Sequence, residues 1–250
     1  AAINLYASKG CPYTCFYYCV YPMQQGRKLR LKSPKKVVDE MVYFFHKLNV
    51  KNYIFRDPVF SIDRKHTILL CEEIIKSNIK FNIAIETHLK NIDNELADIF
   101  LKCGIKLIYV GVESADEEVK QSAKRWSDDN DVQIEKINYL EKIGIKIKTM
   151  YIIGFPEENR DKFLKTVDYA IKVNSSYAQF SVFTPYPGTP VYKDYEKKII
   201  AKKFEDFNQW KLVFEHKNFD ESAVRNLLDL AYKKYYLRFS WIKNFFIRKL

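Results

Sequence analysis

Glycine and proline are scarce in this sequence, with 7 and 8 residues respectively among 250. The chain has no low-complexity tract and no long polar run, so a division into independent domains has little support. No apolar stretch is long enough for a membrane-spanning helix. Because 47% of the residues are hydrophobic, the chain can bury a large core, and its length is typical of an α/β barrel that folds as one domain.

Cysteine is also rare, and its placement is uneven. Cys11, Cys15 and Cys19 lie within nine residues, whereas Cys71 and Cys103 stand in helical apolar patterns and are expected to be buried thiols. A structural zinc site would need a fourth ligand, and no histidine or further cysteine lies nearby. The odd count and the lack of a secretory leader argue against a disulfide framework and favour a cytoplasmic protein. Three thiolates on one loop can hold three irons of a [4Fe–4S] cube and leave the fourth iron open to a substrate or cofactor.

Strand and helix patterns alternate along the chain. We expect strands at residues 3–7, 52–56, 80–86, 106–113, 145–153 and 177–183, and helices at residues 34–48, 63–76, 93–103, 116–122, 133–143 and 160–173. Ser33 and Asp93 are expected N-caps, and Gly104 is an expected helix end. Six strand–helix units predict a parallel sheet with right-handed crossovers. The expected fold class is therefore α/β, a partial (β/α)6 barrel of the TIM type with a C-terminal helical extension.

The expected core barrel covers residues 1–195, and residues 196–250 form the extension, which packs on the barrel as part of the same structural unit. We expect helices at 191–201 and from 220 onwards. The final segment, 239–250, is aromatic and basic, and contains Trp241, Lys243, Phe245, Phe246, Arg248 and Lys249. Packing on the barrel or on an absent domain is favoured for it, with an anionic membrane surface as the alternative.

Basic residues outnumber acidic ones, 42 to 31, for a net charge of +11. Nucleic acid or an anionic membrane surface is the first partner that such a balance indicates. The lysines are spread over every expected helix, however, and no basic run is interleaved with stacking aromatics. Most of them are expected to lie on solvated helix faces, so nucleic acid is not the favoured partner.

The most distinctive motifs follow the expected strands. They are the cysteine loop, Asp57-Pro58, Glu86-Thr87-His88, Gly111-Val112-Glu113-Ser114, Gly154-Phe155-Pro156-Glu157-Glu158, and Thr184-Pro185-Tyr186-Pro187-Gly188-Thr189-Pro190. In a barrel of this type the working residues lie at the carboxyl ends of the strands. We therefore expect these six segments to converge on one mouth.

With these motifs the chain resembles the radical S-adenosylmethionine (SAM) enzymes, most closely the catalytic half of the class that carries a cobalamin-binding domain ahead of its barrel. The resemblance extends over residues 8–15, 19–22, 33–40, 111–114, 154–157, 178–180, 184–189 and 231–238. It implies two cofactors, a [4Fe–4S] cluster and SAM, and an external one-electron reductant. It also implies reductive cleavage of SAM to a 5′-deoxyadenosyl radical, which abstracts hydrogen from an unactivated carbon and leads to methylation, cyclisation or rearrangement.

The resemblance also implies roles for single residues. Cys11, Cys15 and Cys19 would ligate the cluster; Tyr18, Ile152 and Gly154 would contact adenine, Asp57 the methionine amino group, His88 its carboxylate, and Glu113 and Ser114 the ribose or methionine. Simpler interpretations stay open. Glu113 could cap the following helix, and the segment at Gly154 could be only a turn. His88 could be a surface histidine, and Asp57 an ordinary turn residue.

The sequence departs from the family's pattern at two points. The usual cysteine spacing is three residues and then two, whereas both gaps here have three. A bulged loop could absorb the extra residue, and spacings of four also place cysteines on one helical face. In addition, no cobalamin-binding domain and no Asp-x-His-x-x-Gly signature is present, so cobalamin is not an expected cofactor of this chain. A missing N-terminal cobalamin-binding domain is instead an expected partner.

The expected substrate is a small or lipid-like molecule. One alternative is an RNA-modifying enzyme of the methylthiotransferase type, which the positive charge favours. The other is a noncatalytic iron–sulfur protein, a scaffold or an electron carrier, that keeps the cluster without cleaving SAM.

Overall fold

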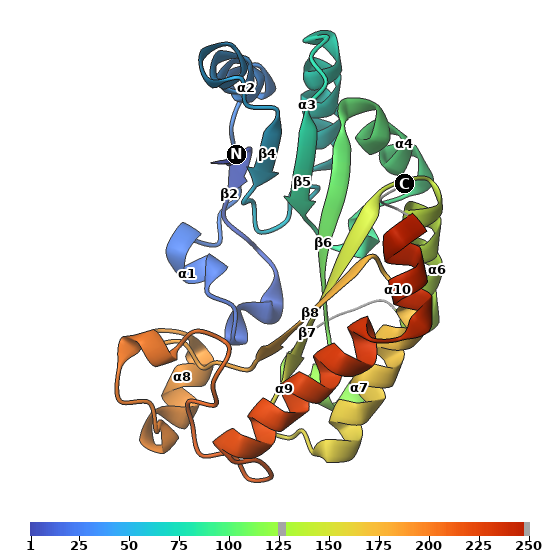
Figure 1. Cartoon of the computed structure of the whole chain (residues 1–250). Coiled ribbons are helices and arrows are strands. Elements are labelled where there is room, and N and C mark those ends of the chain that lie inside the picture. The colour runs from blue at the N-terminus through green and yellow to red at the C-terminus, as the bar shows by residue number, and fades with distance from the viewer. Residues whose placement is uncertain (125–128, 248–250) are drawn as a thin grey trace. The chain divides into compact units, whose positions relative to one another are not determined.

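The computed structural model describes residues 1–124 and 129–247, without the side chains of Thr14, Phe16, Phe246 and Ile247. Figure 1 shows the course of the chain. The strands are β1 (Ala2–Leu5), β2 (Ser8–Lys9), β3 (Arg30–Leu31), β4 (Asn52–Phe55), β5 (Asn82–Glu86), β6 (Ile105–Glu113), β7 (Lys146–Ile153) and β8 (Tyr177–Val182). The α-helices are α1 (Tyr21–Gln25), α2 (Pro34–Leu48), α3 (Arg64–Lys76), α4 (Asn94–Cys103), α5 (Glu117–Ser122), α6 (Asn130–Lys142), α7 (Arg160–Val173), α8 (Pro190–Tyr195), α9 (Glu221–Tyr236) and α10 (Phe239–Ile247). Four short 3₁₀ segments are η1 (Thr14–Tyr17), η2 (Leu89–Asn91), η3 (Glu196–Lys198) and η4 (Phe204–Asp206).

The main sheet has six strands in the order β1-β4-β5-β6-β7-β8. Its first four strands pair in parallel, with Leu5 opposite Phe55 and Glu86 opposite Tyr109. The order in the sheet follows the order in the chain, with a helix after each strand, which is the connectivity of a (β/α) barrel. The predicted fold class, an α/β partial (β/α)6 barrel, is confirmed.

Local sequence signals set the helix ends. Asp93 caps α4 by accepting a 2.9 Å hydrogen bond from the Leu96 amide, and Gly104 ends this helix with φ +94°. A positive φ is easiest for glycine, which has no Cβ. Ser33 also occupies the expected N-cap position, before α2, but its side chain makes no capping hydrogen bond, so that prediction is wrong in its chemistry.

The described chain divides into two compact units. Unit 1 comprises Ala1–Tyr13, Tyr21–Gly111 and Asp131–Lys148. In it α3 packs between α2 and α4, as Figure 1 shows. Cys71 on α3 and Cys103 on α4 are buried, and a hydrogen bond between them together with burial raises the pKa of Cys71. Both are the buried thiols that the sequence predicts.

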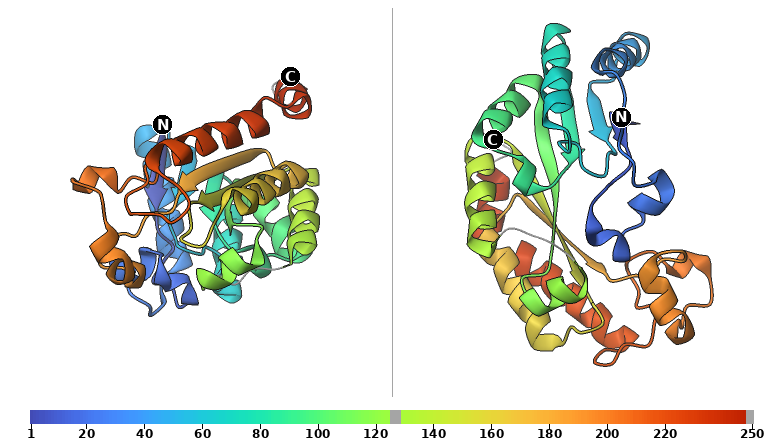
Figure 2. Two further views of the ribbon diagram at one scale, coloured as in Figure 1. Left: turned by 90° about the horizontal axis from the view of Figure 1, so that it is seen from below. Right: turned by 180° about the vertical axis from the view of Figure 1, so that it is seen from behind.

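Unit 2 comprises Thr14–Val20, Val112–Asn130 and Thr149–Leu250. In this unit α9 packs on β8 and α7, as the views in Figure 2 show. The Tyr236 hydroxyl donates to the Ala178 carbonyl at 2.6 Å, and the Tyr232 hydroxyl donates to the Phe180 carbonyl at 3.0 Å. Tyrosines of α9 therefore satisfy backbone groups of strand β8.

The chain after β8 differs in part from expectation. The predicted helix 191–201 is too long, because α8 ends at Tyr195 and Ile199 forms an antiparallel bridge with Phe214. The predicted helix from residue 220 is confirmed: it is α9, capped by Asp220. The boundary between a core at 1–195 and an extension at 196–250 stays a prediction. Within the described residues, no helix has both the length and the apolar character needed to cross a bilayer.

Candidate active site

The cysteine loop, residues 10–29, connects β2 and β3, which pair antiparallel in unit 1, and its residues 14–20 belong to unit 2. It begins at Gly10, whose φ is +93° and where a Cβ would lie 2.1 Å from the Lys28 carbonyl oxygen. The next residue, Cys11, is buried, and its amide donates to the Gly26 carbonyl at 3.1 Å. Only glycine fits at position 10, so the sequence fixes the start of the loop.

Asp57, two residues after β4, holds the segment that leads into this loop. Its carboxylate accepts hydrogen bonds from the Ala7 amide at 3.1 Å, from the Ser8 hydroxyl at 2.6 Å and from the Ser8 amide. Burial raises the pKa of this fully enclosed carboxyl, and the hydrogen bonds from Ser8 and Ala7 oppose that rise. Asp57 thus positions the loop entry; contact with the methionine amino group stays a prediction.

Cys15 and Cys19 occupy a helical turn in unit 2. The Cys19 amide donates at 3.1 Å to the carbonyl of Cys15, which lies in the 3₁₀ segment η1. Residues four apart in such a turn lie on the same face. The unusual second gap of three residues therefore forms one helical turn, and both half-buried cysteines start from the same side of it.

Aromatic side chains hold the same turn within unit 2. The Tyr17 hydroxyl donates to Asp194 of α8 at 2.8 Å, and burial together with this bond raises the pKa of Tyr17. The Tyr18 ring lies edge-on to Phe155, with 5.9 Å between centroids, and tilted against Phe183 at 6.1 Å. Phe155 and Phe183 follow β7 and β8. Tyr18, the predicted adenine contact, therefore lies beside the segment that contains Gly154.

A second contact network surrounds Tyr13 in unit 1. The Tyr13 hydroxyl is bonded to the Asn91 side chain at 3.2 Å, and the Lys90 ammonium lies 4.3 Å from the ring centroid. His88 packs edge-on to the same ring at 6.1 Å, and its Nδ1 accepts from the Lys90 amide at 3.3 Å. His88 is half-buried beside the cysteine loop. Its predicted role toward the SAM carboxylate remains a prediction.

The end of β6 has a strained residue. Glu113 has φ +67°, in the left-handed region that residues with a side chain rarely occupy, and such strain clusters at functional sites. It does not cap the next helix, because the N-cap of α5 is Asp116, which accepts from the Val119 amide at 3.2 Å. The capping alternative for Glu113 is therefore wrong. Ser114 is buried, and its hydroxyl bonds Thr166 and the Asp116 amide, both at 3.1 Å.

The end of β7 contains a residue to which the sequence reasoning gave no role. Gly154, with φ +78°, donates its amide to Glu158 Oε2 at 2.5 Å. Glu158 is fully buried, and burial raises its pKa to about 8. Ile152 is half-buried one residue before the strand ends. In the sequence Glu158 is one of two adjacent acids, Glu157 and Glu158, and no local pattern shows which of the two is buried.

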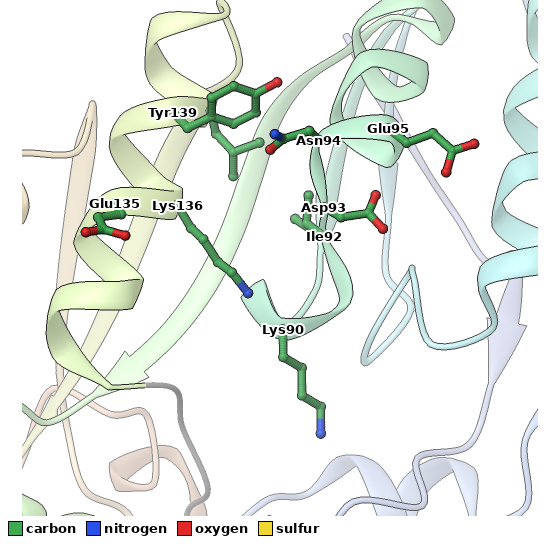
Figure 3. A pocket seen from close by; sticks show the side chains of 9 residues that line it. Lys90, Ile92, Asp93, Asn94, Glu95, Glu135, Lys136 and Tyr139 are labelled. Atoms are coloured by element: carbon green, nitrogen blue, oxygen red, sulfur yellow. The ribbon is translucent and has the colours of Figure 1, made fainter.

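Two cavities lie among the described residues of unit 1, and neither is lined by a predicted site residue. The larger, of about 660 Å³, lies between α6 and the segment from Lys90 to Glu95 (Figure 3). Its Asp93 and Glu95 carboxylates both form ion pairs with Arg64. Because none of the predicted site residues lines this cavity, it is distinct from the predicted site.

The thiols fit the donor set of an iron–sulfur cluster. All five cysteines are present as thiols, so Cys11, Cys15 and Cys19 are not consumed in disulfides. Among residues 1–124 and 129–247, no three histidine, cysteine or acidic side chains are grouped closely enough to hold one metal ion. A cube binds each thiolate through a different iron, so its ligands need not meet at a single point.

Comparison with known families decides the assignment. The sequence profile of the radical SAM superfamily matches residues 5–170. The chain belongs to the radical SAM superfamily. The predicted resemblance is confirmed, and so are the two cofactors that the superfamily uses, a [4Fe–4S] cluster and SAM. Which residues of this chain contact them stays a prediction.

Known relatives of this radical SAM chain include methyltransferases and cyclases. It is 26% identical to an uncharacterized methyltransferase of Pyrococcus horikoshii, over 92% of this chain and 50% of the relative. It is 24% identical to an anaerobic magnesium-protoporphyrin IX monomethyl ester cyclase of Rubrivivax gelatinosus, over 94% of this chain and 42% of the relative. The chain thus spans about half the length of the curated relatives it matches.

A solved structure shares the fold. The radical SAM methyltransferase TsrM of Kitasatospora setae, determined with cobalamin and a [4Fe–4S] cluster bound, superposes with a TM-score of 0.70 at 19% identity. The match covers 78% of this chain and 39% of that one. It supports the partial barrel as the fold of this chain.

Proposed function

We propose that this chain is the catalytic portion of a radical SAM enzyme that methylates or cyclises a small-molecule substrate. The observation that carries the proposal is the helical turn from Cys15 to Cys19, which lies in a chain of this superfamily and presents two thiols on one face. Its methyltransferase and cyclase relatives favour methylation and ring closure over rearrangement. They do not favour the RNA-modifying alternative.

Three cysteines would hold the cluster: Cys11, Cys15 and Cys19. When bound, the reduced cluster supplies the electron that cleaves SAM to methionine and a 5′-deoxyadenosyl radical. Tyr18, beside Phe155 and Phe183, would offer an aromatic surface to adenine and exclude water from it. The other predicted contacts to SAM are Asp57, His88, Glu113, Ser114, Ile152 and Gly154, of which Asp57 acts by fixing the loop entry.

Two partners complete this proposal. The first is an external one-electron reductant. The second is a cobalamin-binding domain, because the fold matches a methyltransferase whose structure contains cobalamin and because the chain spans only about half of its relatives. We place the protein in the cytoplasm, where cysteine thiols stay reduced.

Anaerobic reconstitution with iron and sulfide tests the proposal. We expect one [4Fe–4S] cluster per chain, a reduced-state electron paramagnetic resonance signal that changes when SAM is added, and 5′-deoxyadenosine after reduction with dithionite. Cys19→Ala should lose most of the iron, whereas Cys71→Ala, which removes a buried thiol outside the loop, should keep it.

Thermal unfolding of both variants separates loss of ligation from loss of folding. A cluster that forms but yields no 5′-deoxyadenosine would support the noncatalytic iron–sulfur protein instead. Equal iron content in Cys19→Ala and the wild type would refute the assignment of this loop.

A further inference from the structure

An apolar patch is exposed where α9 meets α10. We call it the α10 patch; it consists of Leu237, Phe239 and Ile242. Leu237 is 68% exposed, Phe239 is 81% exposed and Ile242 is 37% exposed. Single exposed apolar side chains are common on proteins, but three within six residues on one helical junction are a candidate interaction surface.

The opposite face of α10 packs on other residues of unit 2. The Trp241 indole donates to the Ser176 carbonyl at 3.1 Å, its ring packs edge-on to Tyr236 at 4.7 Å, and it stacks on Phe245 at 5.1 Å. Trp241 and Phe245 are four residues apart, and Phe239 and Ile242 are three apart, so the helix has two distinct faces. With its inner face held in this way, α10 presents Phe239 and Ile242 outward.

The chain segment that contains this patch carries charges of one sign only. Residues 231–250 contain six basic residues and no acidic residue. Lys233 and Lys243 are exposed beside the apolar side chains, whereas Lys234 forms an ion pair with Asp168 at 3.3 Å. An exposed apolar helix face bordered by lysines matches the chemistry of an interfacial helix on anionic lipid.

We propose that the α10 patch binds the anionic surface of a lipid bilayer. Phe239, Ile242 and Leu237 would enter the boundary between headgroups and acyl chains, and Lys233 and Lys243 would contact the anionic headgroups. A protein partner with mixed surface charge would match the exposed Lys233 and Lys243 less well. The proposal does not depend on the proposed enzymatic function.

Sedimentation with vesicles tests the inference. The chain is mixed with vesicles of phosphatidylcholine alone or with about one third phosphatidylglycerol. We expect binding to the anionic vesicles that falls as salt rises, and little binding to phosphatidylcholine alone. The double variant Phe239→Ser with Ile242→Ser should bind the anionic vesicles roughly tenfold more weakly, because the lost apolar contacts are those that enter the lipid.

Phe204→Ser provides the matched control, because Phe204 is 82% exposed but lies between Lys203 and Glu205, where the charges are mixed. It should leave vesicle binding unchanged, and thermal unfolding should show that all variants are folded. Equal binding of the double variant and the wild type, or no binding at low salt, would overturn the proposal. So would a dimer of this chain that the double variant abolishes, since the patch would then be a contact between two copies.

Discussion

The Gly154 amide donates a 2.5 Å hydrogen bond to one carboxyl oxygen of Glu158, while the other oxygen is buried without a hydrogen-bond partner among the described residues. Burial raises the pKa of Glu158 to about 8, Asp116 adds to the rise, and the Gly154 amide and Lys162 oppose it. The carboxyl is therefore protonated in the folded protein at pH 7.

The first prediction concerns the pH dependence of stability. The pKa of Glu158 is about 8 in the folded protein against an ordinary value of 4.5, so the folded state binds the proton more tightly. Its contribution to stability is complete below about pH 4.5 and is lost as the pH rises to about 8, a loss on the order of 5 kcal/mol. Glu158→Gln has no proton to lose, so its free energy of unfolding should exceed that of the wild type by a margin that grows from pH 5 to pH 9.

Urea unfolding at pH 5, 7 and 9 measures this margin. Glu157→Gln is the control, because Glu157 is exposed and pairs with Lys217 at 3.1 Å. This control variant should show the same change of unfolding free energy with pH as the wild type. If the unfolding free energies of Glu158→Gln and the wild type changed with pH in parallel, a protonated Glu158 would be contradicted.

Asp57 provides the second prediction. Asp57→Asn places an amide nitrogen where three donors from Ala7 and Ser8 now meet a carboxylate. An unsatisfied buried group costs about 1–3 kcal/mol, and the loop entry should loosen. We expect lower stability in urea and reduced iron uptake on reconstitution. Asp98→Asn, an exposed position on α4, should change neither quantity.

The third prediction compares two glycines. Gly10→Ala would place a Cβ 2.1 Å from the Lys28 carbonyl oxygen. At Gly144, which has φ +104°, an added Cβ would have no neighbouring atom within 4 Å. Gly144→Ala should therefore cost only the strain of a positive φ, about 1–2 kcal/mol. Gly10→Ala should cost more and also reduce cluster incorporation. Denaturant unfolding with iron analysis distinguishes the two, and equal losses would show that the contact at Lys28 relaxes freely.

The fourth prediction separates two expected helix caps. Asp220 accepts a 2.7 Å hydrogen bond from the Ala223 amide at the start of α9, whereas the Ser33 side chain caps nothing. Asp220→Ala should lower the free energy of unfolding by about 1 kcal/mol, and Ser33→Ala should be close to neutral. If thermal unfolding gave a similar loss for Ser33→Ala, a cap at that position would have to form in solution.

The spacing of apolar residues, together with the capping and turn residues between the elements, was sufficient to predict the six strand–helix units. Arg160–Val173 is predicted to the residue from its apolar periodicity, and the structure adds a cap at Asn159. The helix expected at 191–201 failed, because Ile199 pairs with Phe214, a contact fifteen residues away that no local pattern reveals. Hydrogen bonds between distant segments compete with helix propensity, and propensity alone does not predict them.

The candidate site was predictable in its residue types but not in its contacts. The cysteines could be predicted from their spacing. The contacts of Asp57 and Ser114 with their buried partners, Ser8 and Thr166, are seen only in the structure. Glu158 was missed because nothing local distinguishes it from the exposed Glu157 beside it. Burial depends on the packing of whole elements, which a linear pattern does not contain.

The backbone hydrogen bond from Cys19 to Cys15 bears on how related proteins are found. A search pattern that insists on two residues before the last cysteine would discard this chain, although its extra residue completes a turn rather than disrupting the loop. Genome surveys that accept either gap, and then ask for a tyrosine or other aromatic just before the last cysteine, would recover such sequences.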